Sequence, residues 1–498
     1  MVSVPAVVIA APASGSGKTT LATGLIGALR RAGHRVAPFK VGPDYIDPGY
    51  HGLAAGRPGR NLDPVLVGAE RVVPLYRHGS RGCDIAVVEG VMGLFDGRID
   101  ENNTAPVAEG STAQIAAMLG APVILVVDAR GHSQSLAALL HGFATFDTGI
   151  RLGGVILNRV GSERHEQVLR AACARVGLPV LGALPRMAEL AVPSRHLGLI
   201  PAVEHGTAAH AATDAMTELV TAHIDLPAIV ALAASSTAGP QWNPADELHA
   251  ADPVDGSTGS AAAVSTSSAP NGKAGAAVAA APAPTSLSPA GPVVAIAGGA
   301  AFTFGYAEHR ELLGAAGARV VAFDPLRDEL PSGTAGLVLP GGFPEEHAAD
   351  LAANTPLLEA IAHRARAGMP VHAECAGLLY LTRTLDGHRM AGVIDADAEF
   401  GPRLTLGYRD AVALTASPLW QPGERVRGHE FHRTRLTAPA SAPPAWAWRS
   451  PSGETVREGA AAHRVHASYL HTHPAGNPTA VARFVSAATD FARVSALV

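Results

Sequence analysis

Two short segments carry residue types that could do chemistry together. Near the start, the run from Ala11 to Thr20 reads Ala-Pro-Ala-Ser-Gly-Ser-Gly-Lys-Thr-Thr and follows an apolar stretch. A strand, a glycine-rich turn, Lys, Thr and a helix are the context of a phosphate-binding loop, or P-loop. Near the end, Cys375 lies in His-Ala-Glu-Cys-Ala-Gly, between an expected strand and an expected helix. The pair predicts one site for a nucleoside triphosphate and a second site with a thiol nucleophile.

Six residues of the P-loop are candidates for holding the nucleotide. Glycines let the backbone approach the phosphates, whose charge is met by backbone N–H groups and by the start of the following helix. The lysine should reach the outer phosphates, and Thr19 should be a magnesium ligand. The usual first glycine is replaced by Pro12, which indicates a variant loop. The six candidates are Gly15, Ser16, Gly17, Lys18, Thr19 and Thr20.

Acidic residues follow two other expected strands. Asp44 and Asp47 lie in Gly-Pro-Asp-Tyr-Ile-Asp-Pro, where they could hold magnesium or orient a substrate. The alternative is that both only form turns beside the prolines. Glu89 ends an apolar strand, where a carboxylate can reach the metal of a bound nucleotide. Asp96 is expected only to cap a turn.

The segment around Cys375 resembles a nucleophile elbow, a tight turn between a strand and a helix. We expect the helix N-terminus to lower the pKa of this thiol. The base would be His471 or His473, in Ser-Tyr-Leu-His-Thr-His. Cys83 and Cys173 lack such surroundings and are expected to be structural. The predicted oxyanion hole consists of the backbone N–H groups of Gly342, Phe343 and Ala376.

Strand-helix alternation predicts an α/β protein with two domains. Apolar runs at 6–10, 35–40, 85–89, 123–128 and 155–158 alternate with helical patterns at 18–31, 113–119 and 163–176. They indicate a parallel sheet covered on both faces, in a domain over residues 1–234. Residues 235–291 are rich in Ala, Ser, Pro and Gly and are expected to be a disordered linker. Residues 292–498 form a second α/β domain, with a strand-rich region at about 404–466.

Composition narrows the class of protein. The net charge of -5 does not match a nucleic-acid-binding surface, and no apolar run is long enough for a membrane helix. The three cysteines show no close pairing, which favours a reducing compartment and a cytoplasmic protein. His429 and His432 could be ligands, but a chance cluster is equally expected among 22 histidines.

Several motifs together resemble the glutamine-dependent cobyrinic and hydrogenobyrinic acid a,c-diamide synthases of cobalamin biosynthesis. The resemblance covers about residues 3–225 and 292–490. It implies an N-terminal dethiobiotin-synthetase-like P-loop fold and a C-terminal class I glutaminase-like fold. The motifs that carry it are Ser14–Thr20, Lys40–Pro48, Val88–Asp96, Pro340–Glu345, Glu374–Leu378, Leu406–Arg409, Gly428–Phe431 and Ser468–His471.

The resemblance also implies a division of labour. Cys375, with His471 as its base, would release ammonia from glutamine, while ATP would activate the a and c carboxylates of the corrin substrate as acyl phosphates. It implies that Mg²⁺ is held by Thr19, Asp44 and Glu89, and that Tyr45 and Asp47 position the substrate. Many class I glutaminases carry a glutamate two residues after the histidine; here that residue is His473, so the group that orients His471 stays open.

Alternatives stay open at this point. Cobyric acid synthase and sirohydrochlorin a,c-diamide synthase are related amidotransferases, and a regulatory P-loop ATPase fused to an inactive glutaminase-like module is a third reading. The sequence does not distinguish a cobalt-containing from a metal-free macrocycle, and it leaves a homodimer open. The expected partners are glutamine and a small corrin, with neither nucleic acid nor membrane.

Overall fold

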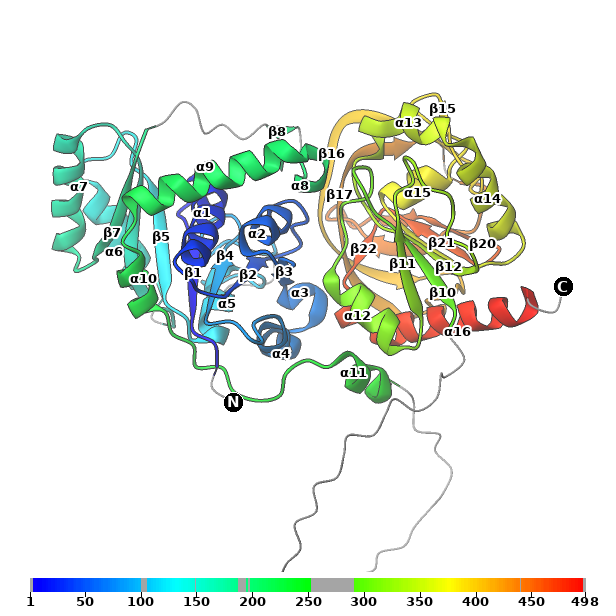
Figure 1. Cartoon of the computed structure of the whole chain (residues 1–498), viewed down its shortest axis with the longest axis horizontal. Helices are drawn as coiled ribbons and strands as arrows, with labels where there is room; N and C mark the ends of the chain where they lie inside the picture. Colours follow the sequence, from blue (N-terminus) through cyan, green and yellow to red (C-terminus); the bar gives the residue numbers. More distant parts are fainter. Residues whose placement is uncertain are drawn as a thin grey trace, which may run out of the picture.

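In the computed structural model, two α/β domains lie side by side (Figure 1). The structure describes residues 3–99, 105–147, 149–186, 194–195, 198–251, 291–438 and 440–495. Most of the expected linker, residues 252–290, therefore lies outside the described residues. No helix of the described ranges is both long and apolar enough to cross a membrane.

The N-terminal domain is built on a parallel sheet with the strand order β3-β2-β4-β1-β5-β6-β7. Side chains of β1 alternate between its two faces, so that Val7 and Ile9 pack in one core cluster and Val8 packs in the other. Both faces are therefore buried, as the apolar runs predicted. The strands are β1 (Ala6–Ala10), β2 (Val36–Val41), β3 (Arg60–Leu62), β4 (Ile85–Glu89), β5 (Val123–Asp128), β6 (Leu152–Val160) and β7 (Val180–Pro185), with β8 (Ser194–Arg195) and β9 (Gly198–Leu199) as a separate pair.

Helices cover both faces of this sheet. On one side α1 packs closely against α9, because glycines of α1 leave room for it: a Cβ on Gly24 would overlap the backbone of Met216. This packing fixes the helix whose first turn carries Lys18. The helices are α1 (Lys18–Arg31), α2 (Asp47–Ala55), α3 (Pro64–Val67), α4 (Ala69–Gly79), α5 (Thr112–Leu119), α6 (Leu136–Thr145), α7 (Glu163–Arg175), α8 (Ala202–His205), α9 (Thr207–His223) and α10 (Leu226–Leu232).

We predicted that the disordered linker begins at residue 235. This prediction is wrong for residues 235–251, which are part of the folded structure. This segment continues along the N-terminal domain, where the Trp242 N–H donates to the Pro74 carbonyl at 3.0 Å. It then forms α11 (Pro244–Ala251), which packs against α12 and α16 of the C-terminal domain (Figure 1). Buried Trp242 supplies the apolar contact that the alanine-rich composition concealed.

The C-terminal domain has two sheets. The first, ordered β11-β10-β12-β13-β21-β20, is parallel except at β20; the second is dominated by the long antiparallel pair β16 and β17. The first sheet contains β10 (Val293–Ala297), β11 (Arg319–Phe323), β12 (Thr334–Leu339), β13 (Val371–Glu374), β20 (Ala460–Ala462) and β21 (Val465–Ser468). The second contains β14 (Thr384–Leu385), β15 (His388–Arg389), β16 (Asp397–Ala413), β17 (Arg425–Leu436), β18 (Trp446–Arg449), β19 (Thr455–Glu458) and β22 (His471–Thr472).

The helices of this domain pack on the first sheet, with α16 against β12 and α15 against β13 and β21. The elbow turn before α15 thus lies at the carboxyl end of β13, at the edge of a parallel sheet where ligands bind. The helices are α12 (Ala307–Ala315), η1 (Pro344–His347), α13 (Ala348–Ala353), α14 (Thr355–Arg366), α15 (Ala376–Leu381), η2 (Pro474–Gly476) and α16 (Pro478–Ser495).

Candidate active sites

The P-loop has the backbone that its glycines predict. Gly15 and Gly17 have φ of 78° and 95°, in the left-handed region that favours glycine. A hydrogen bond inside the loop stabilises it: the Ser16 hydroxyl donates to the Ala13 carbonyl at 2.9 Å. A second hydrogen bond comes from the sheet: the side-chain amide of Asn158 on β6 donates to the Ser16 carbonyl at 2.8 Å. Sequence analysis missed Asn158, which lacks any motif.

Lys18 and Thr19 face different partners at the start of α1. The Lys18 ammonium donates to the Met92 carbonyl at 2.6 Å, and burial together with the Lys40 charge lowers the pKa of Lys18. A polyphosphate would supply the missing negative charge. Thr19 Oγ1 donates to Glu89 at 2.8 Å and to Asp47 at 3.1 Å. Thr20 lies in the same first turn, and its phosphate contact stays a prediction.

A buried cluster of charges lies beside Thr19. Lys40 on β2 is within 2.7 Å of Asp47 and 2.8 Å of Glu89, while His51 Nε2 lies 2.7 Å from the other Glu89 oxygen. Burial opposes the charge of Lys40, but the two carboxylates outweigh it and raise the pKa of Lys40. Burial also opposes the charge of Glu89, but Lys40 and His51 lower its pKa. Lys40 and His51 were not assigned a role from the sequence.

The cluster suits an added cation. Burial and the neighbouring Asp44 carboxylate raise the pKa of Asp47, a sign that negative charge is crowded there. Oxygen atoms of Thr19, Asp47 and Glu89 are the ligand type that Mg²⁺ prefers, with the rest supplied by water and phosphate. Asp44 is less direct: its carboxylate accepts the N–H groups of Ile46 and Asp47 at 2.9 and 3.1 Å, so it orders the turn before α2. Asp96 likewise caps a turn, accepting the Gly93 N–H at 3.0 Å.

Cys375 stands at a strained elbow. Its φ of 49° is unusual for a residue with a side chain, and it joins β13 to α15 as the motif predicted. The backbone N–H groups of Ala376 and Gly342 hydrogen-bond to the sulfur and favour thiolate. Phe343, also predicted for the oxyanion hole, packs its ring against Phe304, and its N–H role stays a prediction.

The expectation of a lowered thiol pKa is wrong for this conformation. Burial raises the pKa of Cys375, and the nearby carboxylates of Glu345 and Glu374 add to the effect against the two N–H groups. The side chain is only 2% exposed, so desolvation outweighs the helix N-terminus. The resting group is therefore a thiol that needs a base.

His471 lies against the same glycine loop as the thiol. A Cβ on Gly341 would overlap the His471 ring, and one on Gly342 would overlap the Ala301 carbonyl, so both glycines are required. The imidazole is fully buried, and its Nδ1 lies 3.7 Å from Glu374. Among the described residues neither ring nitrogen is hydrogen-bonded, which leaves Nε2 available to a reacting group.

The two sites meet through Tyr45. This residue follows Asp44 in the N-terminal domain, yet its ring stacks on Phe304 at 4.9 Å and lies 5.1 Å from the His471 ring. Its hydroxyl accepts a hydrogen bond from Tyr306 at 2.9 Å. A substrate-positioning role for Tyr45 stays a prediction; its ring contacts and its hydrogen bond to Tyr306 are with the glutaminase-like domain.

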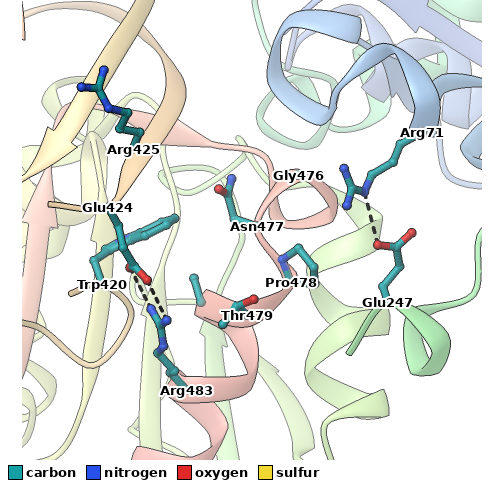
Figure 2. Close-up of a pocket in the computed structure, with 11 residues that line it drawn as sticks. Arg71, Glu247, Trp420, Glu424, Arg425, Gly476, Asn477, Pro478, Thr479 and Arg483 are labelled. Carbon is teal, nitrogen blue, oxygen red and sulfur yellow. Dashed lines mark hydrogen bonds and ion pairs between the residues drawn. The ribbon is translucent and has the colours of Figure 1, made fainter. Parts of the chain in front are cut away.

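An ion-paired arginine and a hydrogen bond also cross the interface between the domains. Arg60 binds Glu308 and Glu311 across the interface, and Tyr408 donates to Asp63 at 3.0 Å. A separate cavity of about 350 Å³ lies at the edge of the interface. Figure 2 shows the pairs Arg71–Glu247 and Arg483–Glu424 on its walls. The cavity shares no residue with the P-loop or the thiol site.

The remaining histidines and cysteines have contacts of a structural kind. His432 donates to the Thr434 carbonyl at 2.8 Å and stacks on Tyr469, and burial lowers the pKa of His429 to about 3. Within the described part of the chain, no group of three or more His, Cys, Asp or Glu side chains could hold a metal ion. Cys173 is buried in α7, and Cys83 contacts Arg57.

Comparison with known proteins matches both domains. Residues 7–200 fit the CobQ/CobB/MinD/ParA nucleotide binding domain, and residues 293–479 fit the CobB/CobQ-like glutamine amidotransferase domain. Hydrogenobyrinate a,c-diamide synthase of Mycobacterium tuberculosis is 59% identical, covering 97% of this chain and 98% of that protein. The chain belongs to the a,c-diamide synthase family.

Other relatives in the a,c-diamide synthase family span the whole chain as well. Hydrogenobyrinate a,c-diamide synthase of Streptomyces coelicolor is 55% identical and covers 97% of each chain. Cobyrinate a,c-diamide synthase of Synechococcus sp. is 38% identical, covering 97% of this chain and 98% of that protein. These matches confirm the resemblance and both predicted domain folds.

Replacing Lys40 tests the buried charge cluster. In Lys40→Met the carboxylates of Asp47 and Glu89 lose their cation, which should lower the free energy of unfolding by about 3–5 kcal/mol. Arg31→Met is the matched control, because the exposed Arg31–Asp214 pair should contribute less than about 1 kcal/mol. Chemical denaturation measures both, and equal losses would contradict a buried cluster that depends on Lys40.

The raised thiol pKa predicts the pH dependence of alkylation. Because thiolate is the reactive form, labelling of Cys375 by iodoacetamide should keep rising beyond the ordinary thiol pKa of about 8.5. Peptide mass spectrometry separates Cys375 from the other two cysteines at each pH. A rate that levels off below neutral pH would show a stabilised thiolate and contradict the dominance of burial.

Proposed function

We propose that this chain amidates the a and c carboxylates of hydrogenobyrinate, using ATP and the amide nitrogen of glutamine. The proposal is supported by a P-loop on one domain and by buried Cys375 and His471 against one glycine loop of the other, with the two domains in contact at Tyr45 and His471. The names of the full-length relatives support the substrate. A regulatory ATPase with an inactive module would have no use for the elbow and its N–H groups.

Each half supplies one reactant. At the elbow, Cys375 attacks the glutamine amide, His471 passes the thiol proton to the leaving ammonia, and water hydrolyses the thioester to glutamate. At the P-loop, a substrate carboxylate attacks the γ-phosphate of ATP, which forms the acyl phosphate and releases ADP, and Lys18 stabilises the charge that develops. Mg²⁺, held by Thr19, Glu89 and Asp47, would neutralise phosphate charge. Ammonia then displaces phosphate from the acyl phosphate and forms the amide.

Two single substitutions should separate the halves. Cys375→Ser should abolish glutamine-driven amidation but leave amidation driven by ammonium, because the P-loop site is untouched. Lys18→Ala should stop ATP turnover with either nitrogen source, while some glutamine hydrolysis persists. Amide formation by mass spectrometry and phosphate release measure both activities. Loss of ammonium-driven amidation in Cys375→Ser would contradict this division of labour.

The choice of macrocycle can be tested directly. Identity is 59% and 55% to two hydrogenobyrinate enzymes but 38% to a cobyrinate enzyme, so we expect the higher kcat/KM with the metal-free substrate. Purified protein is incubated with either macrocycle, ATP, Mg²⁺ and glutamine, and amide groups are counted by mass spectrometry. A preference for cobyrinate would contradict the proposed substrate, and absence of any amide would contradict the proposed function.

A further inference from the structure

Many class I glutaminases carry a glutamate two residues after the catalytic histidine. In this chain that residue is His473, which makes other contacts. His473 Nδ1 accepts the Ala475 N–H at 3.2 Å, and its ring packs 4.0 Å from Tyr306. Burial lowers the pKa of His473 to about 4, so it is neutral near pH 7. A histidine is neutral or cationic, so His473 does not replace the negative charge of that glutamate beside His471.

A different carboxylate faces His471. Glu374, the last residue of β13 and the neighbour of the nucleophile, has one oxygen 3.7 Å from His471 Nδ1. Its other oxygen accepts the Thr472 N–H at 3.0 Å and the Thr472 hydroxyl at 2.9 Å, and lies 3.2 Å from His372 Nε2. In the described part of the chain, no other carboxylate forms an ion pair with His471.

We propose that Glu374 is the positioning carboxylate of His471, so that the strand bearing the nucleophile also completes a thiol–imidazole–carboxylate triad. The inference rests on the proposed glutaminase activity and deepens it. Glu374 fixes the imidazole with Nδ1 toward the carboxylate and Nε2 toward the substrate. It stabilises the imidazolium that forms when His471 takes the Cys375 proton, and it stays ionised while that proton passes to ammonia.

The surroundings of Glu374 favour this role. Burial opposes its charge, but His372 and His471 hold the pKa of Glu374 well below the usual range, so the carboxylate is ionised at neutral pH. Thr472 fixes one oxygen and leaves the second toward Nδ1. Glu458 approaches the neighbouring strand β21, but it accepts the Ser468 hydroxyl and the Tyr469 N–H instead.

Isosteric substitution separates charge from shape. Glu374→Gln keeps an oxygen that can accept both Thr472 bonds, so a merely structural role would leave turnover unchanged. We expect kcat for glutamine hydrolysis to fall about 10- to 1000-fold with little change in KM, because only imidazolium stabilisation is lost. Glu374→Asp, which keeps the charge, should recover part of the loss. Ammonium-driven amidation should match wild type, and Glu329→Gln, at an exposed glutamate, is the control.

The outcomes distinguish the two proposals. Wild-type kcat in Glu374→Gln, or equal losses in the Gln and Asp variants, would overturn the triad while leaving the proposed function intact. Failure of wild-type protein to amidate with ammonium would overturn the proposed function itself. If Glu374→Gln does not fold, Thr472→Val removes the hydroxyl that aims the carboxylate; a lowered kcat at constant KM supports the triad, and an unchanged kcat overturns it.

Discussion

The contact between Tyr45 and His471 is the constraint on which the architecture depends. Tyr45 belongs to the loop whose acidic residues approach Thr19, and His471 belongs to the thiol site. Tyr45, Phe304 and Tyr306 form a buried aromatic cluster at this contact. Ammonia released beside His471 would be protonated in bulk water and lost as a nucleophile. The proposed handover therefore requires a path shielded from bulk water, and an apolar contact between the domains beside His471 favours one.

Further contacts, besides the aromatic packing, hold the two domains together. Arg60 pairs with Glu308 and Glu311 across the same interface, which compensates the charge of the largely buried guanidinium. Farther out, α11 extends the N-terminal domain onto α12 and α16 before residues 252–290 begin. The domains are thus held by their own surfaces, so the length of the intervening segment does not decide their placement.

Short sequence patterns correctly predicted the strands, helices and turns that depend on neighbouring residues. Apolar runs and glycine turns gave β1, α1 and the elbow at Cys375 to the residue, since their signals are short-range. Helix α9, rich in alanine and threonine, was missed because it is defined by packing on α1 rather than by its own periodicity. The thiol pKa was misjudged for the same reason: desolvation depends on the complete fold, while the helix N-terminus is visible in sequence. Asn158, which is distant in sequence from the P-loop it holds, carried no motif of its own. Lys40 opened one of the motifs, but its role depends on contacts with Asp47 and Glu89 that only the fold brings together.

The position of Glu374 makes sense only through its effect on the base. A carboxylate beside a nucleophilic thiol raises the thiol pKa, which by itself impedes attack. Yet the fold fixes this carboxylate with two hydrogen bonds from Thr472 and a contact with His372. Once the proton moves from sulfur to imidazole, the same negative charge faces a cation and becomes favourable. The position of Glu374 thus has two consequences: it raises the pKa of the resting Cys375 thiol, and it stabilises the His471 imidazolium. Only the second effect favours the proton transfer itself.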